Sequence, residues 1–428
     1  MAFVVKTAKT LRNHWKKSTF FFVVGAYGIN YAKNRHNDNL LRRKYCEEAQ
    51  LYGKEKIMLG HRPRRVTVFL NPAAKGGKAR KFFDKTAAPI LYLAGIEVNV
   101  VSTEYEGQVK NFMTVLDTKD TDAIVIAGGN GTLLEAVTGF LRKEDRNFAE
   151  NIPLGVIPLG SSNSFFKILF GHDLDEVKAV AEAAIAVVRA ITKKVDVIKL
   201  QTTDDKTTFA LTGLEVGAYR DAEDRKTKYW YFGPLKSRWT YVRTAMKQWP
   251  PVINVKLSYI EATEANMAFV DADFVQTQAP RKSWNFVDFL FGRRHTKALD
   301  VKTTSNIEEE NLEEMNRIHQ DVSTIELTVS VSTLVDKDSP FKALKLSLGP
   351  SQPNRLQVIN EGWLRNKRKD FKLGSEGDST VLAKRIHIDV TEEGKWYNID
   401  GEAYEAKPVD ISLLRNKLNF FCPISTAT

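Results

Sequence analysis

The sequence predicts a two-part fold in which a doubly wound α/β domain is followed by an all-β domain, a β-sandwich. Three observations lead to this prediction. Apolar strands alternate with helices between residues 65 and 191, as in α/β domains. Loops that contain glycine follow three of those strands. From residue 194 onward, many short alternating strands are separated by turn residues, which is typical of a sandwich.

The first domain begins with the β-branched, apolar segment Arg65–Leu70, which is predicted to be a buried strand. The Asn71-Pro72 turn ends this strand. Further strands are predicted at Ile96–Val101, Ala123–Ala127 and Leu154–Ile157. Helices are predicted at Ala79–Leu93, Gly107–Asp117, Leu133–Arg142 and Val177–Ile191. The wholly apolar Ala123–Ala127 run indicates a central strand of a parallel sheet.

The three glycine-bearing loops are Asn71–Lys78, Gly128–Thr132 and Gly160–Asn163. Each follows a strand, and doubly wound sheets bind ligands at the carboxyl ends of their strands. Glycine lets backbone N–H groups approach an anion, and the helix that follows adds its positive N-terminal dipole. Neither the Walker pattern nor G-x-G-x-x-G after a strand is present. One such loop is usually only a tight turn, but three in one domain favour a nucleotide site.

The second domain begins near residue 195. Its predicted strands are residues 194–200, Thr207–Thr212, Ile253–Ile260, Ser323–Ser332, Ala343–Leu348, Arg355–Ile359, Ile386–Val390, Trp396–Asp400 and Asp410–Leu414. The Asp400-Gly401 pair between strand-like flanks is, taken alone, the tip of a hairpin.

Charge is distributed unevenly along the chain. Residues 1–65 hold fifteen Lys and Arg against four acids, and the other 363 residues hold 48 bases and 48 acids. A nucleic-acid-binding domain carries its positive charge on the folded body, so the neutral body argues against nucleic acid as a partner. The basic head favours targeting or an anionic membrane surface. Two cysteines cannot form a disulfide framework, which excludes a secreted disulfide scaffold.

The head has no acid before Asp38, and its apolar run Phe20–Ala32 is 13 residues long. A membrane-spanning helix needs about 20 apolar residues. A basic, acid-free and partly amphipathic start is typical of a mitochondrial address. Two alternatives stay open: a solvated basic tail with a buried aromatic anchor, and a short segment half inserted in a membrane.

Three strings in order carry a resemblance to a known family. They are N-P-x-x-x-G-G-K-A from Asn71, I-A-G-G-N-G-T-L-x-E from Ile126 and I-P-L-G-S-S-N from Ile157. Together they resemble the lipid-kinase superfamily of diacylglycerol and sphingosine kinases. The segments 6–17, 39–49 and 211–235 are similar to its mitochondrial acylglycerol kinases. The resemblance covers about residues 6–422 and is weakest over 262–320.

The resemblance implies phosphoryl transfer from ATP, with Mg²⁺, to the hydroxyl of monoacylglycerol or diacylglycerol, giving lysophosphatidic and phosphatidic acid. It implies a site on the intermembrane-space side of the mitochondrial inner membrane. Some members take part there in the import of carrier proteins without kinase chemistry, so translocase subunits are possible partners. The expected parts are a head at 1–62, a catalytic domain at 63–194 and a sandwich at 195–422 with an insertion at about 262–320, with the active site in the cleft between the domains.

The resemblance also assigns site residues. For the nucleotide these are Asn71, Gly77, Lys78, Gly128, Gly129, Gly131, Thr132, Glu135, Ser161 and Asn163. The family ends its sandwich with a D-G-E turn in the cleft, and Glu402 matches the acid that is a candidate general base, with Asp400 adjacent. For Glu135, a solvated acid favoured by the helix dipole is the alternative.

One residue departs from the family pattern, because Asn130 stands where G-G-D-G-T has Asp. An Asp there can hold Mg²⁺ or assist proton removal, whereas Asn keeps one acceptor oxygen and lacks the charge. Since phosphoryl transfer depends on neutralising charge, this puts activity in doubt and favours an inactive scaffold as the competing interpretation. If Glu402 supplies the base, Asn130 weakens only metal handling.

Residues 262–320 contain the aromatic segment Trp284–Phe291, followed by Arg293-Arg294-His295, and the acidic run Asn306–Glu314. The aromatic and basic part predicts an interfacial membrane anchor, and a surface helix packed on the sandwich is the alternative. The histidines and cysteines have no ligand spacing, so no structural metal is predicted. A soluble nucleotide-metabolism kinase is a third interpretation, which the basic head and the aromatic segment disfavour.

Overall fold

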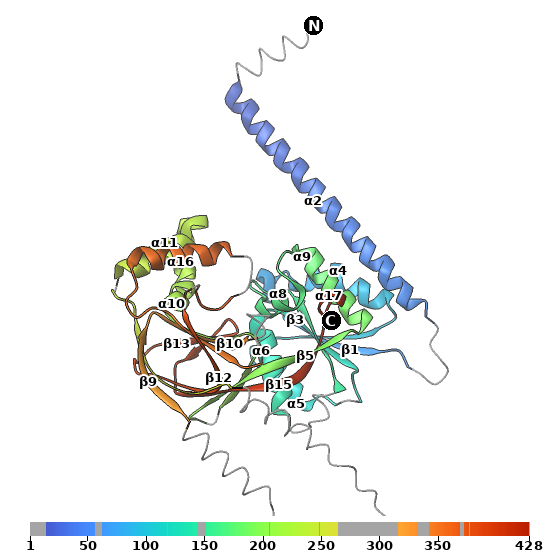
Figure 1. Cartoon of the computed structure of the whole chain (residues 1–428). Helices are drawn as coiled ribbons and strands as arrows, with labels where there is room; N and C mark the ends of the chain where they lie inside the picture. Colours follow the sequence, from blue (N-terminus) through green and yellow to red (C-terminus); the bar gives the residue numbers. More distant parts are fainter. Residues whose placement is uncertain are drawn as a thin grey trace, which may run out of the picture.

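A computed structural model gives the fold (Figure 1). It describes residues 14–427 except 56–61, 118, 144–150, 205, 248, 264–315, 333–341, 369–371 and 376. The predicted anchor 284–291 and the acidic run 306–314 therefore lie outside the described residues. None of the described helices is both long enough and apolar enough to cross a membrane.

The first domain is a parallel sheet covered by helices on both faces. Its strands are β1 (Arg65–Leu70), β2 (Glu97–Ser102), β3 (Ala123–Gly128) and β4 (Leu154–Pro158). Its helices are α3 (Ala74–Gly77), α4 (Ala79–Leu93), α5 (Gln108–Val115), α6 (Asn130–Arg142), α8 (Ser164–Phe170) and α9 (Glu176–Arg189). The parallel order is β2-β1-β3-β4, and every residue of the central strand β3 is buried. This confirms the doubly wound domain predicted from the apolar periodicity.

The second domain is mostly antiparallel. Its strands are β5 (Thr192–Thr202), β6 (Thr207–Ala210), β7 (Gly213–Gly217), β8 (Ile253–Glu261), β9 (Ile318–Thr324), β10 (Glu326–Val331), β11 (Leu344–Leu348), β12 (Ser379–Val390), β13 (Trp396–Ile399), β14 (Glu402–Glu405) and β15 (Val409–Phe421). Its helices are α10 (Ala218–Arg225), the 3₁₀ helix η1 (Lys226–Leu235), α11 (Lys236–Lys247), α16 (Arg355–Lys367) and α17 (Ile424–Ala427). The strands enclose a core of their own, which includes Leu327, Leu346 and Ile388.

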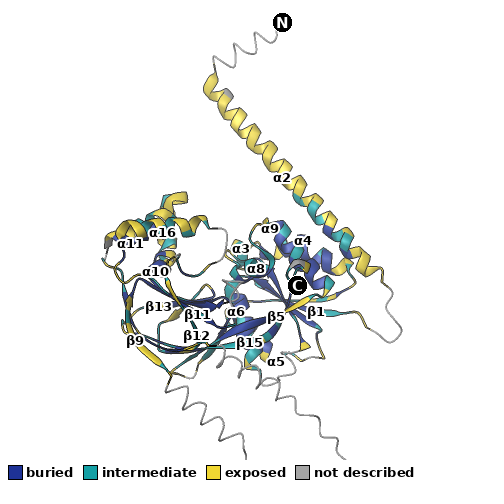
Figure 2. Ribbon diagram, in the orientation of Figure 1, coloured by how far each residue is buried: buried dark blue, intermediate teal, exposed yellow. Residues whose placement is uncertain are grey.

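Strand β15 joins the two domains. In the described part of the chain, fifteen strands form one sheet in which β15 lies between β12 and β4. Its first half pairs with β12 and supplies Val409 and Ile411 to the second core. Its last residues pair with β4 at Phe420 and Leu154, and Leu418 and Phe420 lie in the first core. The burial colouring shows that dark, buried strands continue from one domain into the other (Figure 2).

The prediction of a strand at Arg355–Ile359 is wrong, because these residues begin the helix α16. The Asn354 side chain accepts a hydrogen bond from the backbone N–H of Leu356 at 3.2 Å, and the Gln357 side chain accepts one from the N–H of Asn354 at 3.2 Å. This capping box starts the helix, whereas the prediction relied on the apolar residues that follow. The predicted strand Ser323–Ser332 is in fact two strands, β9 and β10, which meet at Ile325.

Helices α10, η1, α11 and α16 form a cap on the outside of the second domain (Figure 1). Arg365 of α16 fixes this cap to the sheet. Its guanidinium donates to the buried Glu326 carboxylate, with Nη1 to Oε1 at 2.6 Å, and lies 3.6 Å from Glu215 and 3.9 Å from the ring of Tyr219. Burial and the nearby carboxylate of Glu215 raise the pKa of Glu326, although Arg365 lowers it.

Most of the described part of the basic head is one helix, α2 (Trp15–Gly53), of 39 residues. Its second half packs on α4 and α9, where Tyr45 and Ala49 are buried and Glu48 pairs with Arg189 at 2.5 Å. Its first half, including the aromatic residues Phe20–Phe22, projects away from the body and is exposed (Figure 2). The structure thus extends the predicted 13-residue apolar run into a much longer helix.

Candidate functional site

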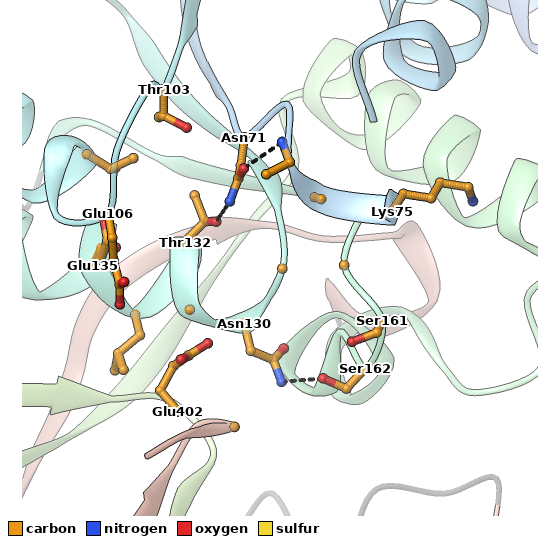
Figure 3. A pocket seen from close by; sticks show the side chains of 18 of the residues that line it. Asn71, Lys75, Thr103, Glu106, Asn130, Thr132, Glu135, Ser161, Ser162 and Glu402 are labelled. Carbon is orange, nitrogen blue, oxygen red and sulfur yellow. Dashed lines mark hydrogen bonds between the residues drawn. The ribbon is translucent and has the colours of Figure 1, made fainter. Parts of the chain in front are cut away.

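A cavity of about 1090 Å³ lies where the first domain meets the turn between β13 and β14 (Figure 3). The predicted residues that line it are Asn71, Gly129, Asn130, Gly131, Thr132, Glu135, Ser161 and Glu402. The loops after β1, β3 and β4 all contribute to its wall, as expected at the carboxyl ends of parallel strands. A cavity of this volume can hold a nucleotide-sized ligand.

Asn71 organises the first loop and ties it to the second. Its side-chain oxygen accepts from the backbone N–H of Ala73 at 3.0 Å. Its amide donates to Thr132 Oγ1 at 3.1 Å, at the start of α6. Figure 3 shows both bonds at the rim of the cavity. The Asn71 side chain therefore fixes the first loop to the start of α6, and it also lines the cavity.

The second and third loops approach each other so closely that only glycine fits. A Cβ on Gly160 would collide with the backbone of Gly129. The Gly128 carbonyl accepts from the N–H groups of Leu159 and Gly160, at 2.9 and 3.0 Å. Asn163, with a left-handed φ of 48°, closes the third loop by a pair of bonds to Gly160 at 2.8 and 3.0 Å. Because these glycines have no side chains, the backbone N–H groups at the N-terminus of α6 are accessible to a ligand. An anion is favoured at that position.

Asn130 is held by three hydrogen bonds. Its amide donates to Ser162 Oγ at 2.9 Å and Ser164 Oγ at 3.1 Å, and its oxygen accepts from the N–H of Ser164 at 2.9 Å. An aspartate could keep all three, because the N–H still donates and both hydroxyls can rotate to donate. Asn130 therefore differs from the aspartate of the family pattern in charge and not in shape.

Asp400 anchors the turn that faces these loops. Its buried carboxylate accepts from the N–H groups of Leu211, Thr212 and Gly213, at 2.7, 2.8 and 3.1 Å, and from Thr212 Oγ1 at 2.5 Å. Burial raises its pKa, although these bonds oppose the rise. Asp400 does not line the cavity. The Asp400 oxygens thus position the turn, and the catalytic role predicted for Asp400 stays a prediction.

Glu402 enters the cavity directly opposite the N-terminus of α6. A Cβ on Gly131 would overlap the Glu402 carboxylate, and a Cβ on Gly401 would lie 2.9 Å from Asn130 Nδ2. Gly401 also has a φ of 93°, which favours glycine. Close contacts therefore join Asn130 and Gly131 of the first domain to Gly401 and Glu402 of the second. They bring the Glu402 side chain next to the glycine-bearing loops after β3 and β4 (Figure 3).

Three glutamates give the cavity its electrostatic character. Burial raises the pKa of Glu402, and the like charges of Glu106 and Glu135 raise it further. Burial also raises the pKa of Glu135, although a bond from the Gly107 N–H at 2.9 Å opposes the rise. Glu135 is therefore a half-buried cavity residue that also caps α5, not a solvated acid. A carboxylate with a raised pKa in a cleft is suited to accept a proton near neutral pH.

Four of the residues predicted to bind the nucleotide do not line the cavity: Gly77, Lys78, Gly128 and Asn163. Gly128 and Asn163 support the loops from behind, by the bonds given above. Gly77 and Lys78 are exposed where α4 begins. In their place Lys75 lines the cavity, with Nζ 2.5 Å from Glu176 and 4.1 Å from the Phe82 ring.

The sequence analysis missed the loop after β2, which contributes Thr103, Glu104, Tyr105 and Glu106 to the cavity. It also missed Ala403 and Tyr404 on β14. The signal for the first group was topological, since this loop too follows a parallel strand at the same edge of the sheet. Unlike the three predicted loops, residues 103–106 contain no glycine.

The residues present fit a nucleotide with Mg²⁺. Open glycine backbone at the N-terminus of α6 suits phosphate groups, and Glu402 and Glu135 offer oxygen ligands nearby. Within the described residues, no three or more His, Cys, Asp or Glu side chains gather closely enough to hold a metal ion by themselves. Mg²⁺ usually binds through one or two carboxylates and the phosphates of a substrate, so a complete protein cage is not required.

Comparison with known proteins gives consistent results. Residues 65–200 match the family described as diacylglycerol kinase catalytic domain, and residues 211–427 match that described as acylglycerol kinase C-terminal. The chain is 36% identical over 425 residues to a mitochondrial acylglycerol kinase of Xenopus laevis, covering 99% of this chain and 96% of that protein. It is 37% identical over 418 residues to that of Homo sapiens, covering 97% and 96%.

A solved structure is similar in fold. A diacylglycerol kinase from Bacillus anthracis str. Sterne matches with a TM-score of 0.51 and 18% sequence identity, covering 85% of this chain and 99% of that one. The similarity extends across both domains and agrees with the two-part fold predicted from the sequence.

Proposed function

This chain belongs to the acylglycerol kinase family, and on that premise we propose that it is an ATP- and Mg²⁺-dependent lipid kinase. Its substrates in this proposal are monoacylglycerol and diacylglycerol, and its products are lysophosphatidic and phosphatidic acid. The observation that carries the proposal is the interlock of Gly131 with Glu402, which puts a candidate base opposite a candidate phosphate site.

In this proposal the backbone of Gly129–Gly131 and Gly160 would hold the phosphates of ATP. Glu402 and Glu135 would help to hold Mg²⁺, which would supply positive charge beside the phosphates when bound. Glu402 accepts the proton of the lipid hydroxyl while the hydroxyl oxygen forms a bond to the terminal phosphorus of ATP. The bond from that phosphorus to the bridging oxygen breaks, and ADP leaves. Asp400 acts only by holding the turn that carries Glu402.

We place the enzyme in the mitochondrion, on the intermembrane-space side of the inner membrane. The relatives of similar length are named mitochondrial. The basic, acid-free start of the sequence fits such an address. The exposed aromatic first half of α2 gives the protein an apolar element for contact with that membrane.

Asn130 supports a second candidate function, in which a weakly active or inactive kinase fold serves as a subunit of the inner-membrane machinery that imports carrier proteins. The asparagine lacks the charge that an aspartate would place beside the nucleotide. The other predicted loop residues are retained, so nucleotide binding is expected in both cases.

Transfer of labelled phosphate from ATP·Mg²⁺ to monoacylglycerol and diacylglycerol in vesicles separates the two functions. For Asn130→Asp we expect a rate at least about tenfold higher than that of the natural chain, equivalent to about 1.4 kcal/mol of barrier. Its thermal unfolding should be unchanged, because the three hydrogen bonds persist. Asn111→Asp on the exposed side of α5 is the control.

Turnover by the natural chain supports the kinase. If only Asn130→Asp turns over, the scaffold function becomes the better account. If neither protein transfers phosphate while both bind ATP, the kinase proposal is wrong.

The pH profile tests the role of the carboxylates. A protonated Glu402 cannot accept a proton, so kcat/KM should fall as the pH drops through its raised pKa. Glu106→Gln removes a like charge and should move this acid limb to lower pH. Glu97→Gln, exposed on β2, should leave the limb in place. An identical limb in all three proteins would contradict the assignment of the base.

A further inference from the structure

The cap on the second domain presents an apolar surface, here named the cap surface. It consists of exposed side chains on η1, α11 and α16: Trp230, Tyr231, Leu235, Met246, Leu356 and Leu364. Trp230 is 77% exposed and Leu356 is 68% exposed. Several large apolar side chains that stay exposed on adjoining helices indicate an interaction site.

Helix η1 is unusual within this surface because none of its ten residues is buried. Its rings pack on one another instead of in the core. The Tyr231 and Phe232 centroids are 4.9 Å apart, and Phe232 stacks on Trp239 of α11 at 5.0 Å. Phe232 and Trp239 therefore form a packed pair beneath the exposed side chains of Trp230 and Tyr231.

The charges on the helices that carry this surface are mostly positive, although the adjoining α10 has the exposed acids Glu223, which pairs with Lys226, and Asp224. Neither η1 nor α11 contains an acid, and their exposed bases are Lys228, Lys236, Arg238 and Arg243. On α16, Arg355 and Lys367 are exposed, whereas Glu361 is paired with Arg365 and Arg368 at 3.3 and 3.1 Å. Aromatic side chains mixed with Lys and Arg fit the headgroup region of an anionic bilayer.

We propose that the cap surface is a membrane-docking surface that inserts Trp230 and Tyr231 among anionic lipid headgroups. This inference rests on the proposed function, since a lipid substrate must be reached at a bilayer. The exposed first half of α2 projects on the same side of the molecule as α11 and α16 (Figure 1). One bilayer can therefore contact both elements, and two weak contacts together bind more firmly than either alone.

The cap is attached to the element that carries the candidate base. Arg365 on α16 lies 3.6 Å from Glu215 of β7, and Glu215 accepts from Asn398 of β13 at 3.1 Å. Asp400 and Glu402 follow on the same hairpin. When the cap binds a membrane, these contacts would therefore fix the orientation of the cavity relative to that membrane.

A fluorescent probe on the full chain tests the proposal. Cys46 and Cys422 are replaced by Ser, and Tyr231→Cys is labelled with an environment-sensitive dye. Val115→Cys on α5 is the matched control, since the original side chains are 62% and 78% exposed and α5 lies on the far side of the molecule (Figure 1). Vesicles contain phosphatidylcholine alone or mixed with phosphatidylserine, and flotation measures total binding.

The expected result is a blue shift of the Tyr231→Cys probe, larger with phosphatidylserine and reduced by salt, with no shift at Val115→Cys. The double variant Trp230→Ser/Tyr231→Ser should lower partitioning by about tenfold. Val115→Ser should not.

If the chain floats with vesicles while the probe at Tyr231→Cys stays solvated, α2 binds alone and the cap surface serves another partner, which overturns the proposal. Absence of flotation also overturns it. Phosphate transfer to acylglycerol in detergent micelles is measured in parallel. A probe shift without transfer keeps the docking surface and rejects the kinase.

Discussion

Glu402→Gln should reduce phosphate transfer to acylglycerol by about two to four orders of magnitude, the usual effect of removing a general base. Glutamine has the same shape and can fill the space over Gly131, but it cannot accept the proton of the lipid hydroxyl. ATP affinity and thermal stability should stay near those of the natural chain, because Asp400 still holds the turn.

Glu405→Gln provides the matched control, since Glu405 lies on the same strand β14 but is exposed and does not line the cavity. It should keep full activity. Near-normal turnover by Glu402→Gln would reject the base assignment. In that case the contact between Glu402 and the N-terminus of α6 would only hold the two domains together and would have no role in proton transfer.

Arg365→Leu should lower the free energy of unfolding by about 3–5 kcal/mol, because it leaves buried carboxylates without their counter-charge. Glu326 is 1% exposed and Glu215 lies beside it. Urea denaturation measures the loss. Lys367→Leu, exposed on the same helix, should change stability by no more than about 0.5 kcal/mol.

The pH dependence of this loss has a definite sign. A carboxylate whose folded pKa is raised binds its proton more tightly in the folded state, so stability falls as pH rises through the interval between its unfolded and folded pKa values. Burial already raises the pKa of Glu326, and removing Arg365 removes the main group that lowers it. The destabilisation should therefore be smaller in mild acid than at alkaline pH. A loss that does not vary with pH would contradict the explanation.

The α/β domain was predicted closely, because its signals are local. The helix Ala79–Leu93 has the bounds predicted from its sequence pattern, and β1 has those predicted from its run of apolar residues. Strand β3 is buried from end to end, as a continuous apolar strand of a parallel sheet should be.

The cap was predicted poorly, because the prediction gave no weight to the local capping box at Asn354 and because tertiary contacts also decide its structure. Leu356, Val358 and Ile359 fit a short strand by composition, but the capping box at Asn354 and the ion pairs of Arg365 make the segment a helix. Nothing in the local pattern indicates that Arg365 reaches Glu326 on a strand almost forty residues earlier. Burial and pairing of this kind become visible only when the sheet has been assembled.

For the candidate site, the glycine loops were predicted from the residues themselves and Glu402 from the resemblance to the family, whereas Glu106, Lys75 and Tyr404 were not predicted. Glycines that permit close approach leave a clear pattern. A single glutamate beside another strand leaves none, since its place in the cavity depends on the packing of β1 against β2. The exclusion of Asp400 from the cavity likewise depends on contacts with residues 211–213, far away in the sequence.

Strand β15 has a consequence for how the polypeptide acquires its structure. This strand, which follows all the others described, completes the hydrophobic interior of the first domain, through Leu418 and Phe420, as well as that of the second. The α/β domain therefore depends for part of its interior on residues that are synthesised after the whole of the second domain up to β14. A premature stop codon upstream of residue 409 would deprive both halves of interior residues at once, so even a late truncation acts as a loss of the whole protein rather than of its tail.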